Sequence, residues 1–195
     1  DEIVLISGAV LLGYPLPLYP LQILWINLVA DSALDKTFPF VKEEGDVMKR
    51  PPKRIAVQFF DKIQIARTLY ASLSIGLIGL WIYHDIFLKQ GHDAAVSTVF
   101  TAIIVATWVN GLQSLKEHEP FFKNIRLSLT INPYLLLGIS IGTVLQVSIL
   151  TFAGSFFHAQ LPDLKAMVYI ISMALGVFFL VELRKWGEWF YSQRR

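Results

Sequence analysis

Five long apolar stretches constrain the fold of this chain more than any other feature. Each is long enough, at roughly 20 residues, to cross the hydrocarbon core of a bilayer as a helix. Charged residues make up only 16% of the 195 residues, against about a quarter in soluble domains, and they fall mainly between the stretches. The chain is therefore predicted to be all-α, a polytopic transmembrane bundle of about six helices with the first one truncated. The five full spans are predicted at Leu21–Phe40, Ile63–Phe87, Val96–Leu115, Pro133–Phe152 and Ala166–Leu183.

The truncated helix is Ile3–Leu12, which is about half the length of a span. The chain begins at Asp1 without an initiator Met, so the sequence reads as a piece of a longer protein. A short interfacial segment is the alternative, but Ile3–Leu12 has no polar face.

Basic residues gather in alternate connections, which predicts the orientation of the bundle in the membrane. Val41–Phe60, Lys116–Asn132 and the tail after Leu183 are rich in Lys and Arg, whereas the hairpin Gly13–Pro20 carries no charge. We therefore predict an integral, multi-pass protein in contact with the lipid bilayer, with a cytoplasmic C-terminus and with Gly13–Pro20 outside. The lack of a long regulatory tail favours a bacterial inner membrane. The net charge of +2 does not suggest nucleic acid, and the lack of cysteine excludes disulfides and thiolate metal sites.

Polar side chains inside the first full span indicate an ion path, because such groups are costly at bilayer depth. Asn27, Asp31 and Asp35 are spaced i, i+4, i+8 and share one stripe of a helix. Glu2 is predicted at a comparable depth on the preceding antiparallel helix, roughly 16 Å from the connecting turn. Hard cations such as Ca²⁺ prefer carboxylate and amide oxygens. We therefore predict a cation site formed by Glu2, Asn27 and Asp31.

A structural interpretation of the same residues stays open. Asn27 can hydrogen-bond between helices, and Asp31 can pair with Lys36. Asp35 and Lys36 lie nearer the predicted cytoplasmic end, where an Asp–Lys pair at the boundary is the simpler interpretation. The alternative is that Lys36 acts as a tethered cation in an ion position.

Two motifs carry a resemblance to a known family. Pro20–Asp31 (PLQILWINLVAD) is followed by Gly45–Pro52 (GDVMKRPP), and the hairpin Gly13–Pro20 (GYPLPLYP) precedes them. Together they resemble the C-terminal transport region of type II, calcium-pump-like P-type cation-transporting ATPases. The resemblance covers the whole chain as transmembrane helices five (truncated) to ten, although it is only architectural beyond about Leu115.

The resemblance implies that Glu2 is an acidic ligand on the fifth helix and that Asn27 and Asp31 are ligands on the sixth. Ala30 stands where the family often has Thr, and Thr107 stands where two-ion calcium pumps have Glu. The family's Asp-Gly-Leu-Pro is replaced here by Asp31–Leu34 (DSAL), without the Gly and Pro that help to unwind the helix. These departures favour one bound ion, or an ion other than calcium, with Asp35 and Thr107 as further candidate ligands.

The resemblance also implies what the chain lacks. Asp35-Lys36-Thr37 is similar to the start of the family's phosphorylation motif, but it lies at the end of a predicted membrane helix. Phosphoryl transfer needs Mg²⁺ and groups that hold phosphate, and the sequence shows no such motif. Residues 1–195 are thus predicted to be one transmembrane domain that does not hydrolyse ATP alone. In the intact protein, cytoplasmic catalytic domains with ATP and Mg²⁺, and the first four helices, would be its partners.

The resemblance predicts the membrane part of an ATP-driven cation pump, and two other functions are alternatives. A passive channel or secondary transporter predicts inverted repeats or paired broken helices, which the sequence does not show. A non-transporting membrane protein on the same scaffold is favoured by Ala30, Leu34 and Thr107.

A predicted outer loop, Lys89–Ala95, is flanked by His84, Asp85, His92 and Asp93. Their spacing matches no metal motif, so they are interpreted as solvated loop residues.

Overall fold

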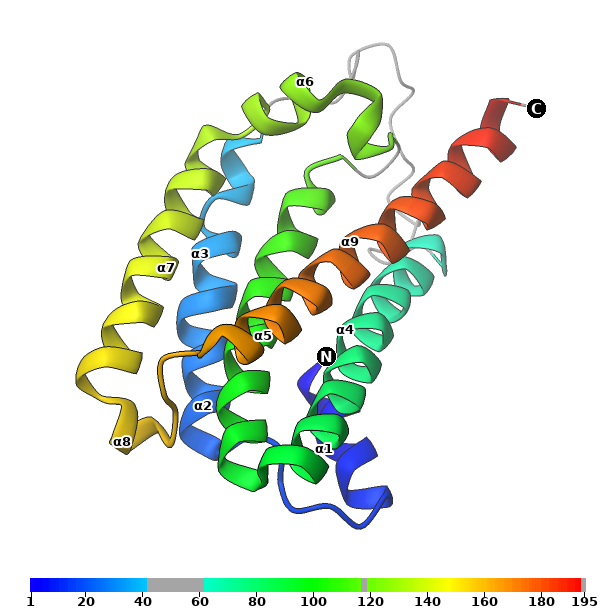
Figure 1. Ribbon diagram of the computed structural model, residues 1–195. Helices are drawn as coiled ribbons and strands as arrows, with labels where there is room; N and C mark the ends of the chain where they lie inside the picture. The colour runs from blue at the N-terminus through cyan, green and yellow to red at the C-terminus, as the bar shows by residue number, and fades with distance from the viewer. Residues whose placement is uncertain (42–61, 117–118, 194–195) are drawn as a thin grey trace.

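The computed structural model describes residues 1–41, 62–116 and 119–193, and the described residues form helices and no strand. Four continuous helices are long and apolar enough to cross a membrane (Figure 1). They are α4 (Lys62–Gln90), α5 (His92–Ser114), α7 (Pro133–Phe152) and α9 (Leu164–Gln193). The predicted all-α, multi-pass membrane bundle is confirmed.

The first helix is short, and the segment after it is not one regular helix. α1 (Glu2–Leu11) has 10 residues. The prediction of one regular helix over Leu21–Phe40 was wrong. That stretch contains α2 (Pro20–Trp25), a π-helical turn η1 (Ile26–Asp31), α3 (Ser32–Asp35) and the 3₁₀ turn η2 (Phe38–Phe40). A π-helical turn widens the backbone from i→i+4 to i→i+5 hydrogen bonds, and such turns are frequent at functional sites.

Helix α5 is the centre of the bundle. It packs against α4 and α9, and it also contacts η1 and α7. Val99, Phe100, Ile103 and Ile104 of α5 are fully buried, as is Met173 of α9. A helix that is apolar on all sides belongs in the interior, whereas one with an exposed apolar side faces lipid in a membrane protein. The exposed apolar side chains of α7 include Leu137 and Val144.

The two ends of the bundle are connected differently. The predicted outer loop Lys89–Ala95 was too long, because only Gly91 separates α4 from α5, at a φ of +90° that favours glycine. At the other end, the connection between α5 and α7 contains η4 (Phe121–Asn124) and α6 (Ile125–Thr130). The predicted loop Val41–Phe60 and the motif Gly45–Pro52 lie outside the described residues, apart from Val41.

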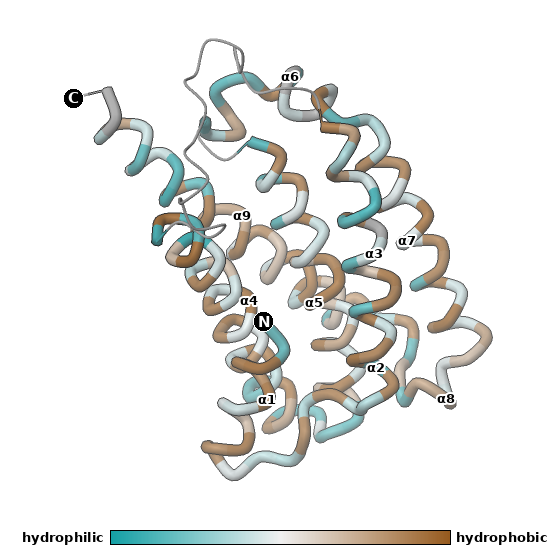
Figure 2. Tube along the Cα trace, turned by 180° about the vertical axis from the view of Figure 1, so that it is seen from behind, coloured by the Kyte–Doolittle hydropathy of each residue, from teal (hydrophilic) through white to brown (hydrophobic). Residues whose placement is uncertain are grey.

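Two buried charges on α9 hold the connection between α5 and α7. The Glu182 carboxylate accepts hydrogen bonds from the main-chain N–H groups of Phe121 (3.0 Å) and Phe122 (3.1 Å). The Lys185 ammonium donates to the carbonyl oxygens of Gln113 (2.5 Å) and Lys116 (2.6 Å) at the end of α5. Both side chains satisfy main-chain groups that a helix end leaves unpaired. Figure 2 shows hydrophilic residues at this end of α9 and hydrophobic residues along the long helices.

Candidate cation site

The first part of the site joins α1 to η1. Asn27 Nδ2 lies 3.4 Å from Glu2 Oε2 and donates a second hydrogen bond to the Ile23 carbonyl oxygen at 2.8 Å. The other carboxylate oxygen of Glu2 is buried and has no hydrogen-bond partner among the described residues. A buried carboxylate oxygen without a partner is costly, which makes it a strong attractor for a cation.

The second part of the site is a cavity of ≈ 230 Å³ between α3, α4 and α5. Asp31 and Asp35 line it from one side, and Thr107 and Asn110 line it from α5. Asp1 also lines the cavity, and its Oδ2 accepts a hydrogen bond from Thr107 Oγ1 at 3.3 Å. Because Asp1 and Glu2 are consecutive, the cavity lies next to the Glu2–Asn27 pair.

The π-helical turn decides which side chains face this region. Ile26, Val29 and Ala30 of η1 are buried in the bundle, whereas Asn27 is exposed and Asp31 is half-buried. The turn η1 packs on α5 and α7, and Ile26, Val29 and Ala30 are its buried residues. The two polar residues therefore remain on the side that faces Glu2 and the cavity.

Two glycines allow the helices around the site to approach closely. A Cβ on Gly76 of α4 would lie 2.5 Å from Val4 Cβ and 2.9 Å from the Asp1 carbonyl oxygen. A Cβ on Gly111 of α5 would lie 2.6 Å from Leu34 Cδ2. Real Cβ atoms do not approach other atoms this closely, so both contacts depend on glycine. They fix α1 against α4 and α3 against α5.

The structure therefore divides the predicted ligands into two adjacent sets. Glu2 and Asn27 form one, while Asp31, Asp35 and Thr107 share the cavity. Among the described residues, no three His, Asp or Glu side chains lie close enough to hold a metal ion together. The ligand assignment of Glu2, Asn27 and Asp31, with Asp35 and Thr107, thus stays a prediction.

Several polar residues of the cavity were not predicted from the sequence. Neither Asp1 nor Asn110 is among the predicted site residues, yet both line the cavity. Asn110 follows the core residue Ile103 by seven residues, which is two helical turns, and this spacing does not indicate that Asn110 lines a cavity.

Lys36 is exposed and forms no ion pair with Asp31 or Asp35 within the described part of the chain. Lys36 therefore does not neutralise Asp31 or Asp35, contrary to the structural interpretation.

The histidines near the α4–α5 connection are not solvated loop residues, so that interpretation was wrong. Tyr14 Oη and His84 Nδ1 lie 2.5 Å apart, and Tyr83 Oη lies 3.0 Å from His92 Nδ1. Both histidines are half-buried on helices and fasten the hairpin between α1 and α2. Asp85 also lies on α4 and binds Lys89 at 2.7 Å, whereas Asp93 is exposed.

Comparison with known proteins decides the family. The family described as "Cation transporting ATPase, C-terminus" matches residues 15–187. The chain belongs to this family. It is a P-type ATPase C-terminal region, and the resemblance noted from the motifs is confirmed.

Relatives of this cation-transporting ATPase region come from bacteria and eukaryotes. A calcium-transporting ATPase of Bacillus subtilis (strain 168) is 26% identical over 182 residues, which is 92% of this chain and 19% of the relative. Calcium-transporting ATPase 1 of Schizosaccharomyces pombe is 23% identical over 93% of the chain and 20% of its own length. The human calcium-transporting ATPase type 2C member 1 is also 23% identical, again over 93% of the chain and 20% of the relative. The chain therefore spans about a fifth of the length of the curated relatives it matches.

Proposed function

We propose that this region binds the transported cation of an ATP-driven pump, with Glu2, Asn27 and Asp31 as ligands. The contact between Asn27 and Glu2 carries this proposal, because it joins two helices through groups suited to a hard cation. Glu2 and Asp31 each offer two carboxylate oxygens. Asn27 and Thr107 add one oxygen each.

The surroundings of these donors support a site that changes shape. Asp31 lies at the end of the π-helical turn and lines a cavity with space for water or an ion. A small rotation about this turn would move Asp31 relative to Glu2, because the turn lacks the regular hydrogen bonds of an α-helix. Binding and release of a cation need such a pair of arrangements.

In the intact pump, the energy would come from cytoplasmic domains that hold ATP and Mg²⁺. The basic connections and the C-terminus would face these domains, in the orientation that the positive-inside rule predicts. Phosphorylation there and cation binding here would be coupled by a free energy that acts in both directions. Calcium is the cation that the names of the relatives suggest, and Ala30 and Thr107 favour a single ion.

The test is cation-dependent phosphorylation of the full-length protein by ATP. Asp31→Asn keeps the size of the side chain and removes its charge, so phosphorylation should lose its dependence on the cation. Asp163→Asn is the control, because Asp163 caps α9 at the outer end. Cation-dependent phosphorylation at the normal level in Asp31→Asn would refute the ligand assignment; absence of any ATP-derived phosphorylation in the unmodified protein would refute the pump.

A further inference from the structure

Helix α9 is longer than the hydrocarbon core of a bilayer. Its 30 residues extend roughly 45 Å at 1.5 Å per residue, whereas the core is about 30 Å thick. The rise from Leu164, its first residue, to Leu183 is roughly 28 Å, which already matches the core. α9 is inclined to α5 and α7 (Figure 1), and an inclined helix gains less height for its length. The following residues, Arg184–Tyr191, here called the α9 tail, therefore lie close to the boundary between hydrocarbon and headgroups.

The α9 tail carries a cluster of aromatic side chains, which are Trp186, Trp189, Phe190 and Tyr191. The rings of Trp186, Trp189 and Phe190 contact one another, with centroids 5.6, 5.5 and 5.2 Å apart. Phe190 is nevertheless 57% exposed, and Tyr191 is 63% exposed. Exposed rings are costly in water, whereas aromatic residues such as Trp and Tyr are enriched where a bilayer meets water. The composition of the tail is therefore typical of the headgroup layer.

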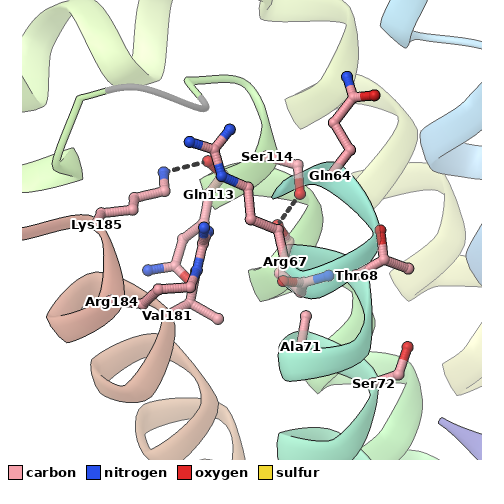
Figure 3. Close-up of a pocket in the computed structure, with 11 residues that line it drawn as sticks. Gln64, Arg67, Thr68, Ala71, Ser72, Gln113, Ser114, Val181, Arg184 and Lys185 are labelled. Carbon is pink, nitrogen blue, oxygen red and sulfur yellow. Dashed lines mark hydrogen bonds between the residues drawn. The ribbon is translucent and has the colours of Figure 1, made fainter. Parts of the chain in front are cut away.

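The charged side chains of the α9 tail bind groups on the bundle. Glu188 accepts from Arg67 Nη2 of α4 at 2.5 Å and from Arg184 Nη1 at 2.8 Å. Lys185 is buried and reaches from α9 to the Gln113 carbonyl oxygen of α5, as Figure 3 shows. A helix end that is surrounded by water has the opposite arrangement, with its charges outward and its apolar groups toward the protein. The side of the tail that faces away from the bundle is thus its apolar side.

The apolar side of the tail continues the side of α9 that faces hydrocarbon. The exposed residues of this side are Leu175, Phe179, Leu183 and Phe190. They are spaced i, i+4, i+8 and i+15, which keeps them on one side of a helix. Gly187 borders the same side and is exposed, and among the described residues no atom lies within 4 Å of its Cβ position. Because α9 is long and apolar enough to cross the membrane, the surface that covers Leu175 and Phe179 is lipid, and the tail presents an extension of that surface.

We propose that the α9 tail lies in the headgroup layer of the bilayer and binds the lipid interface through Trp186, Phe190 and Tyr191. Lipid is the partner because the exposed side of the tail is continuous with the side that faces hydrocarbon. A cation also lies beside the ring cluster, since Lys123 Nζ is 5.3 Å from the centroid of Trp189. Basic side chains next to aromatic rings suit a layer that contains phosphate groups.

This inference goes beyond the proposed pump function and does not depend on it. It requires only that α9 cross a bilayer. The position of the tail is measured without ATP or transported cation, so failure of the pump proposal would leave the result unaffected.

The experiment attaches a nitroxide to single cysteines of the full-length protein in lipid nanodiscs. Residues 1–195 contain no cysteine, and any cysteine elsewhere in the protein is replaced first. Power-saturation EPR measures how often the nitroxide collides with oxygen, which concentrates in lipid, and with a nickel chelate, which stays in water. The tail is labelled in Gly187→Cys and in Phe190→Cys. Leu175→Cys is the control within the hydrocarbon, and Asp93→Cys, at an exposed position at the start of α5, is the control in water.

We expect the ratio of oxygen to nickel collisions at both tail positions to be several-fold above that of Asp93→Cys and below that of Leu175→Cys. A ratio equal to that of Asp93→Cys would overturn the proposal, because the tail would then lie in water. Rare collisions with both reagents would also overturn it, because a protein surface would then cover the tail. A ratio equal to that of Leu175→Cys would place the tail in hydrocarbon and refute the headgroup position. Gly187→Cys keeps the test decisive if Phe190→Cys does not fold, because the space around its Cβ position is open.

Discussion

Asn27 Nδ2 lies 3.4 Å from Glu2 Oε2, although the two residues belong to different helices and are 25 positions apart. This contact crosses between α1 and the π-helical turn of the second membrane segment. It depends on the hairpin Gly13–Pro20, which returns the chain antiparallel to α1. The fold thus brings an acidic and an amide side chain together from two different helices.

The position of Glu2 depends on the close packing of α1 against Gly76. Gly76→Ala should lower the free energy of unfolding by about 1–3 kcal/mol, because the added methyl would overlap Val4 and the Asp1 carbonyl. It should also weaken cation binding as α1 moves outward. Gly187→Ala is the control, since nothing lies within 4 Å of its Cβ position on α9. It should be neutral or stabilising by up to about 1 kcal/mol. Equal thermal unfolding of the two variants in detergent would contradict this packing argument.

Asn132 links the C-terminal end of the segment Leu21–Phe40 to α7. It is fully buried, accepts from the N–H groups of Tyr134 (3.1 Å) and Leu135 (3.3 Å), and donates to the Thr37 carbonyl at 2.8 Å. Asn132→Ala should cost about 2 kcal/mol, from a lost helix cap and a lost buried hydrogen bond. Ser140→Ala on the exposed side of α7 should change the melting temperature little. If Asn132→Ala unfolds at the wild-type temperature, the cap does not stabilise the fold.

Tyr83 binds the hairpin Gly13–Pro20 to the bundle. Its hydroxyl donates to the Pro15 carbonyl at 3.1 Å and lies 3.0 Å from His92 Nδ1, and the residue is fully buried. Tyr83→Phe should lower stability by about 1 kcal/mol, because the hydrogen bond from the buried hydroxyl to the Pro15 carbonyl is lost. Tyr134→Phe removes a hydroxyl from a residue that is 52% exposed and should have almost no effect. Chemical denaturation of both variants measures the difference, and equal stabilities would show that the hydroxyl of Tyr83 contributes nothing.

Glu119, in the connection between α5 and α7, should make stability depend on pH. The hydrogen bond from Lys123, at 2.7 Å, is the largest cause that lowers the Glu119 pKa below its ordinary value, and Lys116 at 3.6 Å adds to it. A lowered pKa in the folded state means that the stabilisation is present above the pKa of the unfolded chain, about 4.3. It is lost as the pH falls through the folded value. Wild type should exceed Glu119→Gln in melting temperature at pH 7, and the difference should vanish in acid; a difference that grows in acid would contradict the assignment.

The long helices could be predicted from sequence because apolar length is a strong signal. Pro133–Phe152 was predicted with the bounds that α7 has, since Asn132 and Pro133 mark its start. α4 extends to Gln90 rather than Phe87, because the prediction followed the apolar residues and the helix ends on the polar residues Lys89 and Gln90.

The π-helical turn could not be predicted, because Ile26–Asp31 contains neither Gly nor Pro. The wider turn contains no helix-breaking residue. Its residues Ile26, Val29 and Ala30 are buried in the bundle. The i, i+4 spacing of Asn27 and Asp31 indicated polar groups on one side. It could not show that Asp31 lines a cavity while Asn27 contacts Glu2, since this depends on three-dimensional packing.

Equilibrium binding of Ca²⁺ and other divalent cations to the full-length protein tests the central claim most directly. If Glu2, Asn27 and Asp31 hold the ion together, Glu2→Gln and Asp31→Asn should each weaken binding at least 10-fold, while Glu119→Gln in the connection between α5 and α7 should bind as the wild type does. Wild-type affinity in both Glu2→Gln and Asp31→Asn would contradict the claim.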